Sequence, residues 1–178
     1  TVNDGFRPVV RFWDRLMYPA QALTSLPQAV RTLLDPADCG PVTLSFCQDV
    51  QAEAYNFPAR FFAPKLWHQR RSPPDQRELA RALALLRDAK QPLIIAGGGV
   101  HYAGALDELA AFATRHDIPV AETQAGKSAL AADHPMCIGS IGVTGTAAAN
   151  TLAALADVVL AIGTRLQDFT TGSRALFQ

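Results

Sequence analysis

The chain has 178 residues, of which 49% are hydrophobic and 18% charged, a composition typical of a globular chain of one domain or slightly more. Its 16 basic and 16 acidic side chains cancel, and its pI is near 6.8, which argues against nucleic acid or an anionic membrane as a partner because both require clustered positive charge. No apolar run approaches the roughly 20 residues that a membrane-spanning helix needs.

The first fifty residues predict a strand, a helix and a second strand. Residues 9–12 and 41–46 have the β-rich composition of short strands. Between them, four apolar residues recur at helical spacing: Leu26, Val30, Leu33 and Leu34. Pro27 is expected in the first turn of this helix, where its missing N–H costs little. The unit has the length of one parallel crossover and is too short to bury a core of its own.

Residues 51–74 show no periodicity and contain several prolines, which predicts an extended connection between two domains. Arg70 and Arg71 form its basic pair. Because no basic face accompanies them, they are expected to be solvated and not to bind nucleic acid. The predicted domains are therefore residues 1–50 and 75–178, with the linker between them.

Residues 75–178 alternate between helical and strand patterns. Asp75 and Glu78 have the spacing of a capping box at the start of a helix, whose apolar stripe is Leu79, Leu83 and Leu86. Two further helices are expected over residues 106–113 and 145–155. Strands are expected at residues 93–96, 118–121 and 157–163, where short apolar runs suit strands buried on both faces. The alternation predicts an α/β fold with a doubly wound, mainly parallel, Rossmann-like sheet.

The three predicted strands of this half all end in small or polar turns. These turns are residues 97–99, 122–126 and 163–165. In open parallel sheets the ligand crevice lies outside the carboxyl ends of the strands, so the turns should share one edge. Residues 142–146, just before a helix, add a fourth place where backbone amides could meet a phosphate or a carbonyl.

Two phosphate-binding motifs are only partly present. Gly97 and Gly99 match the start of a dinucleotide fingerprint, and Glu122 lies where a ribose-binding acid would, but Tyr102 stands at the third glycine position. An NAD- or FAD-binding oxidoreductase domain is therefore an alternative. Residues 126–128 match the tail of a P-loop whose first glycine is replaced by alanine.

The remaining candidate side chains form no complete catalytic set. The four histidines have no partner at metal-ligand spacing: His68, His101, His116 and His134. The three cysteines are far apart, without a C-x-x-C pair, and favour a reducing cytoplasm: Cys39, Cys47 and Cys137. Cys47 is interpreted as a buried structural thiol in preference to a nucleophile. Two alternatives stay open for Asp49 and for the pair Arg165 and Asp168. They either contact a ligand or serve as ordinary loop caps and ion pairs.

Several stretches together resemble the thiamine-diphosphate-dependent enzymes of the acetohydroxyacid synthase superfamily. They are residues 40–42, 48–50, 92–99, 118–123, 142–150 and 163–168. Four stretches look most like the branch of that superfamily that hydrolyses a cyclic dione in inositol catabolism: residues 11–15, 48–54, 122–128 and 168–171. Cys47 departs from the family pattern, which has proline before Gln48.

The resemblance implies that residues 1–50 end a pyrimidine-binding domain and that residues 75–178 form most of a central domain. The catalytic glutamate and the motif that binds Mg²⁺ and the diphosphate would lie outside this chain, so we expect an interior piece without turnover of its own. The implied chemistry is carbanion formation at a ring ketone and cleavage of a ring C–C bond with water. The alternative within the superfamily is an activity like that of acetolactate synthase or a 2-oxoacid decarboxylase. A homodimer or homotetramer in the cytoplasm is implied for the whole enzyme.

The superfamily also includes flavin enzymes that hold FAD along the strand-end edge of the central domain. Carried over by position, the flavin-like site comprises Gly98, Gly99, Thr123, Gly145, Thr146, Arg165 and Asp168. A third interpretation is a non-catalytic oligomerisation module, which predicts self-association without nucleotide affinity.

Overall fold

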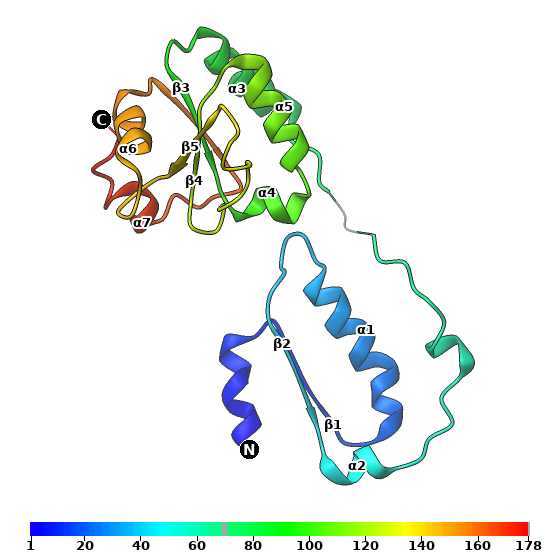
Figure 1. Cartoon of the computed structure of the whole chain (residues 1–178). Helices are drawn as coiled ribbons and strands as arrows, with labels where there is room; N and C mark the ends of the chain where they lie inside the picture. The colour runs from blue at the N-terminus through cyan, green and yellow to red at the C-terminus, as the bar shows by residue number, and fades with distance from the viewer. Residues whose placement is uncertain (69–70, 178) are drawn as a thin grey trace. The chain divides into compact units, whose positions relative to one another are not determined.

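The computed structural model describes residues 1–68 and 71–177, so Gln69, Arg70 and Gln178 lie outside the described residues. The chain divides into two compact units, Thr1–Ser72 and Pro73–Gln178 (Figure 1). Within the described ranges, no helix is both long enough and apolar enough to cross a membrane.

The first unit is a parallel strand pair between two helical segments. In β1 and β2, Phe12 lies opposite Val42 and Leu16 lies opposite Phe46. Figure 1 shows α1 on one face of the pair and η1 on the other. The elements are η1 (Val2–Val9), β1 (Phe12–Leu16), η2 (Pro19–Gln21), α1 (Ala22–Leu33), β2 (Val42–Phe46), α2 (Gln48–Ala52) and η3 (Ala59–Phe61).

The first strand forms, but the bounds predicted for it at residues 9–12 are wrong, because the chain up to Val9 is a 3-10 helix and pairing starts at Phe12. Asp4 accepts a hydrogen bond from the Thr1 hydroxyl at 2.9 Å, which ties the first turn of this helix. The Trp13 indole N–H donates to the backbone carbonyl of Asn3 at 2.8 Å and anchors the helix to the strand. Val9 remains 66% exposed, so its apolar character was a poor guide to the strand.

The expected position of Pro27 is also wrong, because α1 begins at Ala22 and contains Pro27 in its interior. At the start of α1, the Asp14 carboxylate accepts from Gln21 Nε2 at 3.0 Å and from the Ser25 hydroxyl. Burial alone would raise the pKa of Asp14, but these bonds and one from the Arg15 N–H hold it below its ordinary value. Asp14 therefore ties the first turn of α1 to β1.

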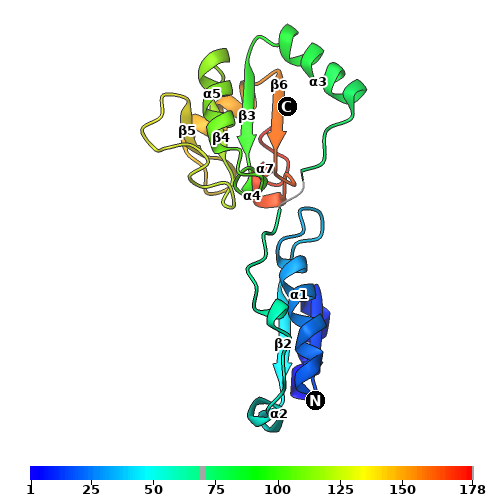
Figure 2. The same cartoon turned by 90° about the vertical axis from the view of Figure 1, so that its right-hand side faces the viewer.

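The second unit is a four-stranded, fully parallel sheet in the order β5-β4-β3-β6. Figure 2 shows β3 and β6 side by side and running the same way. The elements are α3 (Gln76–Asp88), β3 (Pro92–Ala96), α4 (Gly98–Ala103), α5 (Leu106–His116), β4 (Val120–Glu122), β5 (Cys137–Ser140), α6 (Ala147–Leu155), β6 (Val158–Ile162) and α7 (Asp168–Thr171).

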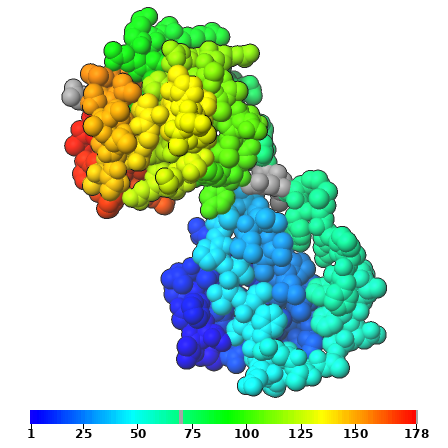
Figure 3. All heavy atoms as spheres, viewed as in Figure 1, coloured from blue at the N-terminus to red at the C-terminus, as the bar shows by residue number. Residues whose placement is uncertain are grey.

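Helices cover both faces of this sheet, which confirms the doubly wound α/β fold. Along β3, Ile94 and Ala96 pack on the face covered by α5, whereas Leu93 and Ile95 pack on the face covered by α6. All four side chains are at most 1% exposed, as expected for a central parallel strand. The segment between β4 and β5 lies against α5 (Figure 3), where His134 Nε2 is 3.2 Å from the Thr114 hydroxyl.

Several details of this unit differ from expectation. β6 was expected to be buried, but it lies at an edge of the described sheet and is only half-buried. β5, α4 and α7 were not predicted at all. The capping box is half formed: Asp75 accepts from the N–H groups of Arg77 and Glu78, whereas the Glu78 carboxylate pairs with Arg81 at 3.0 Å. Glu78 prefers this ion pair on the exposed helix surface.

Candidate functional site

A groove of about 290 Å³ lies at the carboxyl ends of the four parallel strands of the second unit. It sits where the strand order reverses, since β4 follows β3 on one side of the sheet and β6 returns on the other. Open α/β sheets bind ligands at this type of switch point. The fourteen lining residues are Gly98, Gly99, Tyr102, Thr123, Gln124, Ala125, Ile141, Thr144, Gly163, Thr164, Arg165, Gln167, Phe169 and Thr170.

The floor of the groove is a close contact between two glycine turns. A Cβ on Gly99 would lie 2.5 Å from Cα of Gly163, and the Gly99 N–H donates to the Gly163 carbonyl at 2.9 Å. The Gly97 N–H likewise donates to Ile162 at 2.8 Å. These glycines therefore let β3 and β6 meet, and the amides of Gly97 and Gly99 are already bonded within the chain.

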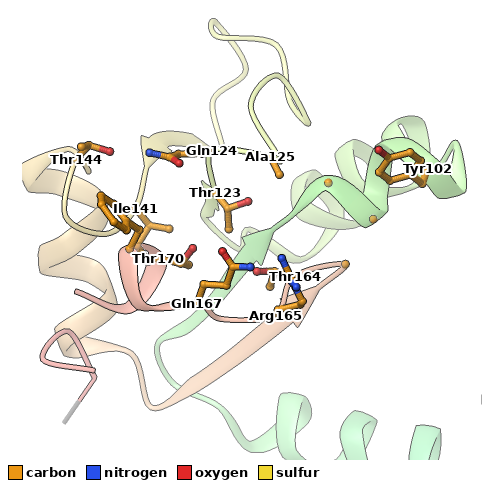
Figure 4. Close-up of a pocket in the computed structure, with 14 residues that line it drawn as sticks. Tyr102, Thr123, Gln124, Ala125, Ile141, Thr144, Thr164, Arg165, Gln167 and Thr170 are labelled. Atoms are coloured by element: carbon orange, nitrogen blue, oxygen red, sulfur yellow. The ribbon is translucent and has the colours of Figure 1, made fainter. Parts of the chain in front are cut away.

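The walls carry mostly neutral hydrogen-bonding groups. Figure 4 shows Thr123, Gln167 and Thr170 grouped around the middle of the groove, with Tyr102 at one end and Thr144 at the other. Thr123 is only 6% exposed, and its hydroxyl accepts from the Gly126 N–H at 3.1 Å. Such hydroxyl and amide groups suit a ligand rich in oxygen atoms.

Arg165 is the one charged residue among the fourteen lining residues. When the Gln167 side-chain amide is oriented with its oxygen toward Arg165, Gln167 Oε1 accepts from Arg165 Nε at 3.0 Å and also from Arg165 Nη2. This contact orients the guanidinium while the residue remains exposed. With one cation and no carboxylate in the lining, the groove favours an anionic ligand such as a phosphate ester.

Four of the residues proposed for a flavin-like site line the groove: Gly98, Gly99, Thr123 and Arg165. The other three, Gly145, Thr146 and Asp168, are not among its lining residues. The Thr146 hydroxyl instead caps α6, accepting from the Ala149 N–H at 3.1 Å.

Most backbone N–H groups of the turn at residues 142–146 already donate hydrogen bonds within the chain. Gly142 donates to the Asn150 side chain at 3.0 Å, and Val143 donates to Phe169 at 2.9 Å. Gly145 and Thr146 donate to backbone carbonyls at 2.9 and 2.8 Å. This turn therefore stabilises the junction of β5, α6 and α7 and presents few free donors to a ligand.

Sequence reasoning missed the part of the groove that depends on unpredicted elements. Ile141 follows β5, and Phe169 and Thr170 belong to α7. Thr144 lies in the turn at residues 142–146, which the sequence did mark. Gln124 and Thr164 lie in strand-end turns that the parallel-sheet rule did mark. The same rule would have indicated the missed lining residues, but it can be applied only after each strand has been located in the sequence.

The alternative phosphate motifs do not form their expected sites. Glu122 is 8% exposed, and its carboxylate accepts from the N–H groups of Ser128 and Leu130, so it is engaged in its own loop and not free for a ribose. A P-loop, against which the replaced first glycine already argues, does not form: no helix follows Ser128, and a Cβ on Gly126 would lie 2.1 Å from the Ala96 carbonyl oxygen.

The cysteine and histidine side chains make ordinary contacts in the described structure. Cys47 is half-buried, and its Sγ accepts from Arg15 Nε at 3.3 Å. His101 Nε2 lies 3.0 Å from the Lys127 carbonyl oxygen. Over residues 1–68 and 71–177, no group of three or more His, Cys, Asp or Glu side chains could hold a metal ion.

A doubly wound sheet with a groove at its strand ends is typical of domains that bind nucleotides or cofactors. Residues 79–178 match the family model described as thiamine pyrophosphate enzyme, central domain. The chain belongs to this family.

The full chain is 49% identical over 178 residues to proteins called 3D-(3,5/4)-trihydroxycyclohexane-1,2-dione hydrolase. Examples come from Bacillus cereus (strain AH820), Bacillus anthracis (strain CDC 684 / NRRL 3495) and Bacillus thuringiensis (strain Al Hakam). The match covers all of this chain and 28% of each relative.

Proposed function

We propose that these residues belong to a thiamine-diphosphate-dependent hydrolase that opens the ring of 3D-(3,5/4)-trihydroxycyclohexane-1,2-dione. The observation that carries this proposal is the 49% identity with proteins of that name, which extends over both units of the chain. In this proposal residues 1–50 end the pyrimidine-binding domain, residues 51–74 are a linker, and residues 75–178 form most of the central domain.

The cofactor would supply the carbanion chemistry that ring C–C cleavage needs. The described residues would supply scaffold and a groove, and the ligands for Mg²⁺ and the catalytic glutamate are proposed to lie elsewhere in the enzyme. We further propose a homo-oligomer in the cytoplasm, in keeping with the three free cysteines.

The proposed activity is tested on the complete product of the gene that encodes these residues. With thiamine diphosphate and Mg²⁺ it is expected to consume the dione and to release an open-chain acid, whereas the 178-residue chain alone is expected to show no turnover. A complete product that binds thiamine diphosphate but leaves the dione intact would count against the proposal.

We also propose that the strand-end groove binds the nucleotide part of FAD or a similar phosphate ester. Support comes from the lining: Arg165 supplies the positive charge, and the Thr123, Thr164 and Thr170 hydroxyls supply hydrogen-bonding partners. These groups fit a diphosphate and its sugar hydroxyls.

Arg165→Ala is expected to weaken FAD binding about tenfold, because a hydrogen bond to a charged group contributes roughly 1.5 kcal/mol or more. FAD fluorescence titration of the chain measures this effect. Arg115→Ala, which removes an exposed arginine of α5, is the matched control and should leave the Kd unchanged. Equal affinity in the wild type and in both variants would show that FAD does not use this groove.

A further inference from the structure

Glu122 is a buried carboxylate at the end of β4 whose partners are neutral. The residue is 8% exposed, and none of the ion pairs among residues 1–68 and 71–177 includes it. A buried charge without a cation is costly unless hydrogen bonds satisfy it. The hydrogen-bond donors that satisfy the Glu122 carboxylate therefore indicate its structural role.

Both carboxylate oxygens are used by one loop. Oε2 accepts from the Ser128 N–H at 3.2 Å, and Oε1 accepts from the Leu130 N–H at 3.0 Å. These amides lie six and eight residues farther along the chain, so the carboxylate closes residues 123–130 into a compact loop. Hydrogen bonds to a charged acceptor are the stronger kind.

The same loop is strained and needs such a tie. Ser128 has φ of +68°, a left-handed conformation that costs a non-glycine residue free energy. Gly126 is packed against the Ala96 carbonyl so closely that a Cβ there would lie 2.1 Å from the oxygen. Across the loop, His101 Nε2 lies 3.0 Å from the Lys127 carbonyl oxygen. The loop is thus held at several points, and Glu122 is its only charged anchor among the described contacts.

The loop begins with groove residues. Thr123, Gln124 and Ala125 follow Glu122 directly and line the groove, and Figure 4 shows Thr123 and Gln124 side by side on one wall. We propose that Glu122 is a positioning residue whose carboxylate binds the backbone amides of residues 128 and 130 and so holds this wall of the groove in its ligand-binding shape. Its effect on a ligand rests on the function proposed for the groove, whereas its effect on the loop does not.

Amide hydrogen exchange followed by NMR on the 178-residue chain tests the effect on the loop. Glu122→Ala is expected to speed exchange at Ser128 and Leu130 at least tenfold, with a much smaller change at Leu109 in α5. Glu122→Gln keeps the side-chain volume but only one acceptor oxygen, so it should lose protection at one of the two amides. Glu108→Gln, at an exposed glutamate of α5, is the matched control and should change neither.

If Glu122→Ala does not fold, the exchange rates of Ser128 and Leu130 in Glu122→Gln test the proposal instead. Exchange at Ser128 and Leu130 within twofold of the wild-type rate in every variant that folds would overturn the proposal. FAD titration of the same proteins separates the two proposals. Faster loop exchange with at least fivefold weaker FAD binding supports both. Faster loop exchange in a chain that never binds FAD supports the role of Glu122 and removes only FAD as the groove ligand.

Discussion

Gly142→Ala is expected to destabilise the second unit by about 3 kcal/mol or more. Gly142 has φ of +102°, and a Cβ there would lie 1.9 Å from the carbonyl oxygen of Phe169. The two penalties are independent, because one arises from the backbone of residue 142 and the other from the collision with α7. Phe169 and Thr170 line the groove, so the displacement of α7 should also distort the binding site.

Urea unfolding followed by circular dichroism measures this loss. Both tryptophans, Trp13 and Trp67, lie in the first unit, so their fluorescence reports separately on the unit that is not altered. Gly5→Ala is the matched control, since a Cβ at Gly5 meets nothing within 4 Å, and it should change stability by no more than about 0.5 kcal/mol. A Gly142→Ala protein as stable as Gly5→Ala would show that α7 does not pack as described.

Ile94→Ala is expected to cost about 3 kcal/mol, within the range of roughly 2–5 kcal/mol for deleting a buried aliphatic side chain. Ile94 is fully buried in the centre of the sheet, in the cluster that contains Leu109, Ala113 and Val120. The close packing of the parallel strand with α5 leaves little room for collapse into the cavity.

Leu85→Ala on α3 provides the contrast for Ile94→Ala. Leu85 is 64% exposed, so its loss should change the free energy of unfolding by about 0.5 kcal/mol or less. The same urea experiment compares the two variants. Similar losses for Ile94→Ala and Leu85→Ala would contradict the assignment of β3 as the buried centre of the unit.

The sequence predicted the elements whose own residues are continuously apolar and therefore indicate burial. One such element is the continuous apolar run of Leu93, Ile94 and Ile95, which forms a central, buried parallel strand in the structure. β5 was missed because Cys137–Ser140 contains a glycine, is only half-buried, and pairs through an irregular register at Gly139. Short edge strands carry little local signal, since pairing to a neighbour decides them.

The candidate site was predictable to the extent that it follows from strand ends. The rule placed Thr123 and Arg165 at one edge, and the groove includes both. Thr146 came instead from its position in the family pattern, and its hydroxyl caps α6; motif position does not show which donors and acceptors bond within the chain. The use of Glu122 also could not be predicted, since its partner amides are brought to it by the left-handed conformation of Ser128.

The most direct test is to add 3D-(3,5/4)-trihydroxycyclohexane-1,2-dione to the purified complete gene product and to follow the loss of the dione with and without thiamine diphosphate. We expect one dione to be consumed for each molecule of open-chain acid formed, and only when thiamine diphosphate and Mg²⁺ are present. Persistence of the dione in the presence of a folded, cofactor-loaded protein would contradict the proposed function.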